Sequence, residues 1–193
     1  ENREMMNAIS TTISIALIST LVATVMGTLA AIGISKSRRL IKELVLSVNN
    51  FPILNPEIVT AIGLMLLYSS LNVEKGFVTM LLAHIIFSTP YVILSVLPRL
   101  RRLDPDIAEA ALDLGATPLQ ALWKVIVPMI MPGIVSGALI AFTMSFDDFV
   151  ISYFVSGNGV KNISILVYTM SKRINPTINA LSTILVVIIT IVL

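Results

Sequence analysis

Long apolar segments dominate this sequence and restrict what it can fold into. They cover residues 9–34, a stretch within 44–71, residues 77–97 and 126–151, and a run that begins near Ala180. Apolar residues make up 56% of the 193 residues and charged residues only 12%, and the mean hydropathy is +0.94. A water-soluble domain carries about a quarter charged residues, whereas a membrane-spanning helix needs roughly 20 mainly apolar residues. The sequence therefore predicts an all-α transmembrane protein.

The composition also excludes several classes of site. The chain has no cysteine, which excludes disulfides, thiol catalysis and zinc–thiolate centres. A single histidine and few clustered carboxylates leave little material for a metal site. No GxxxxGK[ST] loop is present, so the chain has no P-loop for nucleotide. The net charge of +2 comes from basic residues in short loops between apolar segments, so we expect no catalytic residue, no metal and no nucleic-acid partner.

The basic residues are distributed unevenly between the loops. Two loops are rich in them: Lys36, Arg38, Arg39 and Lys42 after the first apolar segment, and Arg99, Arg101, Arg102 and Lys124 before the fourth. The other connections carry fewer for their length. Because short cytoplasmic loops are enriched in Lys and Arg, we expect residues 98–125 on the cytoplasmic side. The N-terminus and residues 155–176 are then expected outside.

The loop before the fourth apolar segment contains signals for two short helices. Asp104 suits the N-cap of the first, with Pro105 in its first turn. Gly115 suits the left-handed residue that ends this helix, and Thr117 and Pro118 can begin a second one that continues through Trp123. The pattern predicts a knob that projects from the membrane and fits a groove on a soluble partner.

The same residues resemble a family signature. Glu109, Ala110 and Ala111, then Gly115, then Val125-Ile126-Val127-Pro128 resemble the EAA motif of ABC-importer permeases, which prefers Ile or Leu at the two valine positions. The likeness continues through residues 145–149 (SFDDF), 154–157 (FVSG) and 179–181 (NAL). Over this longer run the chain resembles the second, C-type permease subunit of spermidine/putrescine transport systems.

The resemblance implies a type I ABC-importer permease fold with about five spans in this chain and a sixth, N-terminal span missing. The chain begins with Glu1, and its last apolar run (180–193) is shorter than a span, so we expect missing residues at both ends. Residues 1–193 would form one transmembrane domain, with a cytoplasmic coupling segment at about 98–125 and an outer connection at about 152–179. The residues expected to couple to an ATPase are Glu109, Ala110, Ala111, Leu112, Gly115, Ala116 and Pro118.

The partners that the resemblance implies are a second permease subunit in a heterodimer, two cytoplasmic ATPase subunits, an extracytoplasmic binding protein and membrane lipid. ATP and Mg²⁺ would be used by the ATPase, and this chain would be a transport subunit of the bacterial cytoplasmic membrane, neither an enzyme nor a cofactor-binding protein. Glu109 would pair either with a basic residue of the ATPase or with the nearby Arg101 or Arg102.

Two adjacent acids, Asp147 and Asp148, are placed at the outer end of the fourth apolar segment, where the helix dipole disfavours negative charge. Pairing with a basic residue of a partner subunit is one explanation, and attraction of a cation beside a translocation path is the other. Aromatic neighbours, including Phe146 and Tyr153, offer faces to an ammonium group. Since neighbouring helical residues differ by about 100°, we expect one acid to face the path.

Glu57 and His84 are the polar residues that interrupt other apolar segments. Asn55-Pro56-Glu57 reads as the N-cap and first residues of a restarting helix, so Glu57 has either a capping role or a role in the path. His84 is expected to be a neutral ring bonded to a neighbouring helix.

The outer connection has apolar residues at helical spacing: Ile163, Leu166, Val167, Met170 and Ile174. This pattern predicts a helix packed along the membrane surface, a landing site for a binding protein, or both. The alternative functions are the same machinery with an anion or a metal complex as substrate, a secondary transporter driven by an ion gradient, and a purely structural subunit. Secondary transporters often contain inverted repeats and paired broken helices, and neither is visible in the sequence.

Overall fold

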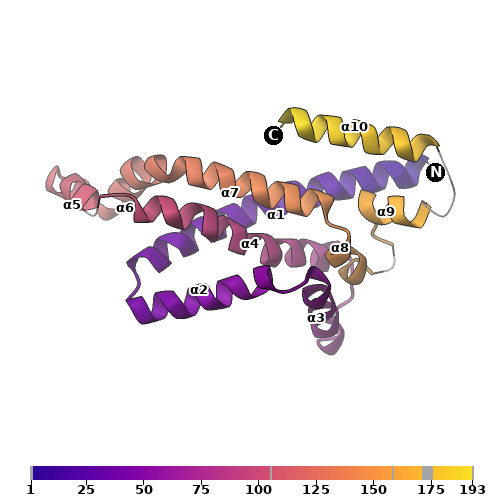
Figure 1. Cartoon of the computed structure of the whole chain (residues 1–193), viewed down its shortest axis with the longest axis horizontal. Coiled ribbons are helices and arrows are strands. Elements are labelled where there is room, and N and C mark those ends of the chain that lie inside the picture. Colours follow the sequence, from indigo (N-terminus) through magenta and orange to yellow (C-terminus); the bar gives the residue numbers. More distant parts are fainter. Residues whose placement is uncertain (1, 105, 158, 171–175, 193) are drawn as a thin grey trace.

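The computed structural model describes residues 2–104, 106–157, 159–170 and 176–192. Three long helices form its centre: α1 (Asn2–Lys36), α4 (Phe77–Arg101) and α7 (Val127–Asp147). They pack side by side along most of their length, as Figure 1 shows. The described part of the chain is helical with no strand, which agrees with the predicted all-α class.

Glycines allow the three central helices to approach closely. Val92 of α4 lies against two of them, Gly27 of α1 and Gly137 of α7, so that a side chain at either position would press on it. Gly133 of α7 is similarly close to Ser95 and Arg99. Small residues at such crossings favour helix association in lipid, where burial of apolar surface gives no net drive.

The second apolar segment is a broken pair, α2 (Arg39–Leu54) and α3 (Glu57–Ser70), bent by 103°. The break is at the predicted place, but the prediction that Asn55 is the N-cap of the second helix is wrong. Asn55 ends α2 in an extended conformation, and Pro56 stands before the first residue of α3 without a side-chain cap. Proline disfavours helical backbone in the residue before it, which explains why α2 ends at Leu54.

The predicted knob consists of α5 (Asp106–Asp113) and α6 (Pro118–Ala121). The Asp104 carboxylate accepts the backbone N–H of Asp106 at 3.1 Å, and Gly115 has a φ of +86°. Thr117 and Gln120 form a reciprocal capping box at the start of α6. These caps confirm the predicted helix–glycine–helix elbow; Pro105 lies outside the described residues.

The predicted coupling segment, about 98–125, includes the ends of two long helices. Helix α4 continues to Arg101, and α6 runs through a π-helical turn (Leu122–Ile126) directly into α7. The second helix of the knob is therefore one end of a continuous helix, Pro118–Asp147. Because knob and span share this helix, a movement of one is transmitted to the other.

The fourth apolar segment does not remain helical to residue 151. Helix α7 ends at Asp147, and Asp148 is extended before α8 (Val150–Val155). Helix α9 (Ile163–Met170) follows, as the spacing predicted, and its buried Ile163 and Leu166 pack against Ala8 of α1. Ile174, the last residue of that pattern, lies outside the described residues. Helix α10 (Pro176–Val192) completes the chain.

Within the described residues, α1, α4 and the continuous helix 118–147 have the length and composition of membrane spans, and the bent pair α2–α3 is a possible fourth. The apolar part of α10, Ala180–Ile191, is shorter. In Figure 1 the α1–α2 junction and α5 lie at one end of the bundle, and the N-terminus, α3, α8 and α9 lie at the other. Both basic loops thus share one end, as the charge rule requires.

Candidate functional site

The break between α7 and α8 creates a buried carboxylate. Asp148 is only 7% exposed, and its Oδ1 and Oδ2 atoms accept the backbone N–H groups of Ile151 at 3.2 Å and Ser152 at 2.7 Å. These are the unpaired donors of the first turn of α8, so the Asp148 side chain caps that turn from the position before the N-cap residue Phe149. The predicted conflict with a helix dipole is therefore wrong for Asp148, because a new helix begins two residues later and its positive end faces the acid.

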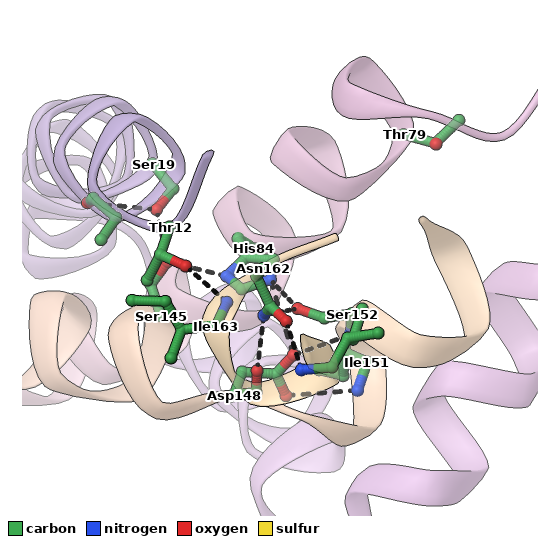
Figure 2. Close-up of polar contacts among 12 residues, drawn as sticks. Thr12, Ser19, Thr79, His84, Ser145, Asp148, Ile151, Ser152, Asn162 and Ile163 are labelled. Carbon is green, nitrogen blue, oxygen red and sulfur yellow. Dashed lines mark hydrogen bonds and ion pairs between the residues drawn. The ribbon is translucent and has the colours of Figure 1, made fainter. Parts of the chain in front are cut away.

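His84 of α4 connects this cap to the central helices (Figure 2). The ring is 1% exposed; its Nδ1 atom lies 2.7 Å from the hydroxyl of Ser145 and its Nε2 atom lies 3.0 Å from that of Ser152. Nε2 also lies 3.5 Å from Oδ2 of Asp148. The Ser145 hydroxyl in turn bonds to Ser19 of α1 at 2.9 Å. The predicted bonding of His84 to a neighbouring helix is confirmed: the ring bonds to α7 and α8, and Ser145 links it to α1.

Asn162 attaches the outer connection to the same cluster. Its side chain is 2% exposed; Nδ2 donates to the Asp148 carbonyl and to the Ser152 hydroxyl, both at 2.9 Å, and Oδ1 accepts the Ile165 N–H at 2.8 Å. Its position before α9 and its cap to Ile165 are typical of an N-cap. Asn162 was not predicted as a site residue, although an Asn immediately before an apolar helical pattern is a recognisable N-cap signal.

Asp147 has the opposite environment. It is exposed and makes no hydrogen bond or ion pair within the described part of the chain. It lines a cavity of about 320 Å³ between the end of α7, α9 and α10. The lining residues include Phe146, Ile163, Ser164, Val167 and Ser182. Of the adjacent pair, Asp148 is therefore buried and Asp147 is exposed; that one of the two acids faces a path stays a prediction.

Glu57 is the other acid near this region. It is exposed and occupies the first turn of α3, where the helix dipole favours a carboxylate. It lies within electrostatic range of Asp148 and Asp147 and of Tyr91, and α3 packs against α8. Glu57 is both at the start of a helix and near the aspartates, so its predicted roles in capping and in the path do not exclude each other.

An aromatic group surrounds the start of α8. Phe149, Tyr153 and Tyr168 have ring centroids 4.8 to 5.9 Å apart in each pairing, and Phe154 adds an edge contact to Tyr153 at 5.7 Å. Tyr153 is half exposed. The predicted Phe146 is not part of this group and instead pairs with Phe142. Tyr168, on α9, was not predicted, because its approach to α8 depends on the fold of the outer connection.

The knob presents most of its predicted residues to the surroundings. Glu109, Ala110, Leu112, Gly115 and Pro118 are exposed, whereas Ala111 and Ala116 are half-buried. The neighbouring Leu114 is 89% exposed. Within the described residues, Glu109 makes no ion pair with Arg101 or Arg102. The pairing of Glu109 with a basic residue of an ATPase stays a prediction, and exposed leucines on a short helix are typical of a docking surface.

The comparison with known proteins identifies the family. A family model described as the binding-protein-dependent transport system inner membrane component matches residues 23–193. The chain belongs to this family. Putrescine transport system permease protein PotI of Escherichia coli (strain K12) is 39% identical over 194 residues, covering 94% of this chain and 67% of PotI. Spermidine/putrescine transport system permease protein PotC of Haemophilus influenzae is 36% identical over 188 residues, covering 97% and 73%.

The fold has a counterpart among solved structures. A structure of the MetNI methionine ABC transporter, in an inward-facing conformation, superposes with a TM-score of 0.79 at 17% identity, covering 96% of this chain and 89% of that one. The family and the fold confirm the resemblance to ABC-importer permeases, and they make the chain a transport subunit and not an enzyme.

The expectation that the chain lacks the broken helices of secondary transporters was wrong. Broken helices are present, since both α2–α3 and α7–α8 are interrupted. It is membership in a binding-protein-dependent transport family that excludes the gradient-driven alternative.

Proposed function

We propose that this chain passes a polyamine such as putrescine or spermidine through the bacterial cytoplasmic membrane. The observation that carries the proposal is the placement of two exposed acids, Glu57 at the start of α3 and Asp147 at the end of α7, within electrostatic range of each other, while α3 packs against α8. The names of the relatives PotI and PotC support this substrate class.

The electrostatics of this region favour a cation over an anion. At about 4 Å an amine and a carboxylate attract each other by roughly 1 kcal/mol in water and about 4 kcal/mol at an intermediate dielectric. Such an attraction guides an elongated diamine and still allows it to leave. The half-exposed ring of Tyr153 adds a face for an ammonium group. An anionic substrate would be repelled by the same acids.

The proposal includes the partners of the transport cycle. A second permease subunit would complete the path in a heterodimer, and two cytoplasmic ATPases would receive the knobs and use ATP and Mg²⁺. A binding protein would deliver substrate to the outer face formed by α8 and α9, and residues 1–193 would act as one transmembrane domain. Because Pro118–Asp147 is a continuous helix, closure of the ATPases on the knob would shift the far end, where Asp147 lies. This is a rigid element moving between two arrangements.

Radiolabelled uptake by the assembled transporter in proteoliposomes tests the substrate assignment. We expect Asp147→Asn and Glu57→Gln each to raise the KM for putrescine or spermidine about tenfold, the change that corresponds to roughly 1.4 kcal/mol of lost attraction. Amounts of copurified ATPase should stay unchanged, since neither side chain is buried.

Glu74→Gln is the matched control, because Glu74 is an exposed acid in the loop between α3 and α4 at the same end of the molecule. It should leave uptake unchanged. Normal uptake by the Asp147→Asn, Glu57→Gln double variant would refute the proposed path. If Glu74→Gln raises the KM as much as Asp147→Asn and Glu57→Gln do, the effect comes from the general negative charge of the surface and not from a path.

A further inference from the structure

The two oxygens of Asp148 are already used by the protein. One accepts from Ile151, and the other accepts from Ser152 and lies near His84. The residue is buried, so a substrate amine could reach this carboxylate only if the turn opened. A buried carboxylate is tolerated when donors surround it, and here the donors come from α8 and α4.

We propose that His84, Ser152 and Asn162 are positioning residues that act through Asp148. They form a set that we name the Asp148 clamp, and this clamp fixes the α7–α8 turn so that Asp147 alone, of the two acids, is presented to the path. The inference rests on the proposed function, because it concerns the placing of an acid that is to attract the substrate.

The contacts of the clamp explain why it fixes the turn in one arrangement. Ser152 is the shared member: its backbone N–H donates to Asp148, and its hydroxyl contacts both His84 and Asn162. Asn162 also holds the main-chain carbonyl of Asp148 at 2.9 Å, so the side chain and the backbone of the turn are restrained by different donors. Figure 2 shows these groups converging on Asp148. A fully satisfied buried polar network specifies one geometry more strictly than apolar packing does.

The clamp also determines what moves with the central helices. His84 belongs to α4 and is linked through Ser145 to Ser19 of α1. The hydroxyl of Thr12, also on α1, accepts the Ile163 N–H at 2.9 Å. The outer connection is therefore tied to α1, α4 and α7 on the side of the clamp. We infer that α8 and α9 move together with these helices and carry Asp147 with them.

Cysteine reporters test the clamp independently of transport. The chain has no native cysteine, Ile151 is 0% exposed inside the capped turn and Ala16 is 0% exposed on α1. In the complete transporter, Ile151→Cys should react slowly with a membrane-impermeant thiol reagent. His84→Ala or Asn162→Ala should raise its rate roughly tenfold, as expected when buried hydrogen bonds are lost and their partner groups are left unsatisfied. Ala16→Cys should stay protected, which distinguishes local opening from unfolding.

The same variants are measured for uptake. We expect His84→Ala and Asn162→Ala to raise the KM for putrescine several-fold with little change in the maximal rate, and His84→Gln, which keeps a hydrogen-bonding side chain, to restore both readouts in large part. An unchanged Ile151→Cys rate in both alanine variants overturns the clamp. A faster rate with an unchanged KM overturns its positioning role.

If both Ile151→Cys and Ala16→Cys react in the His84→Ala variant, that variant has unfolded. The Ile151→Cys rate and the KM are then measured in Ser152→Ala, which removes only one hydroxyl. The proposed function fails separately: it is refuted when Asp147→Asn transports normally, whatever the reporter rates are.

Discussion

Gly27 of α1 lies directly against Val92 of α4, so close that a Cβ atom at position 27 would stand 2.7 Å from both Cβ and Cγ1 of Val92. The carbonyl oxygen of Thr89 would be 3.2 Å away. No side chain fits this space without moving one of the two central helices. The close approach of α1 and α4 at this crossing therefore requires glycine at position 27.

Gly27→Val should consequently destabilise the bundle. Overpacking a close contact costs about 1–3 kcal/mol, and we expect a lower midpoint of thermal unfolding for the purified permease. Gly33→Val is the matched control, since it lies on the same helix and a Cβ at position 33 would meet nothing within 4 Å. Equal stability of the two variants would contradict the described crossing.

Replacing each of the two adjacent aspartates by alanine should change the free energy of unfolding by different amounts. Asp148→Ala removes the cap of α8 and leaves buried donors without a partner, which costs roughly 2–3 kcal/mol. Asp147→Ala removes an exposed group and should change the free energy of unfolding by no more than about 0.5 kcal/mol. Thermal unfolding of the two variants in the same detergent measures the difference. Similar losses from both would show that Asp148 is not the buried member of the pair.

The knob could be predicted because its signals are local. Asp104, Gly115 and Thr117 act on backbone groups a few positions away, so their residue types alone indicate where each helix begins or ends. The break at Pro56 was predictable for the same reason, since proline restricts its immediate neighbour. What local signals could not give is the bend of 103° between α2 and α3, which depends on packing.

The role of Asp148 could not be predicted, because its partners are distant in sequence. His84 lies more than 60 positions before it, and apolar residues resume directly after the two aspartates with Phe149, Val150 and Ile151. The prediction from the apolar pattern alone therefore placed the end of the fourth span at residue 151. Asn162 was missed for a related reason: its donors are satisfied by groups that only the folded outer connection brings near.

The elbow of the knob should be sensitive to a side chain at Gly115. A Cβ there would meet no neighbour within 4 Å, yet φ is +86°, so the cost is one of backbone strain alone, about 1 kcal/mol or more. We expect Gly115→Val to lower uptake while the permease still inserts and purifies. The loss should appear in the ATPase copurified with the permease or in the stimulation of ATP hydrolysis by substrate.

Glu109→Lys tests the charge of the same surface. Since Glu109 has no local ion pair among the described residues, reversing its charge should act on a partner and leave the fold of the permease intact. Glu43→Lys, a reversal at another exposed acid near the same end of the molecule, should preserve uptake. If Glu109→Lys and Gly115→Val both transport normally, the knob is not the coupling surface.

The orientation of the whole chain can be tested with two single cysteines, because the native sequence has none. Leu114 in the knob is 89% exposed, and Lys161, two residues before α9, is also exposed. Figure 1 shows α9 at the end of the molecule opposite α5. The two basic loops lie at the end of the knob, and such loops remain cytoplasmic. A membrane-impermeant thiol reagent added to intact cells should therefore modify Lys161→Cys and not Leu114→Cys. Inside-out vesicles should give the opposite result. Modification of Leu114→Cys in intact cells would reverse the orientation and remove the knob from the side on which ATP is available.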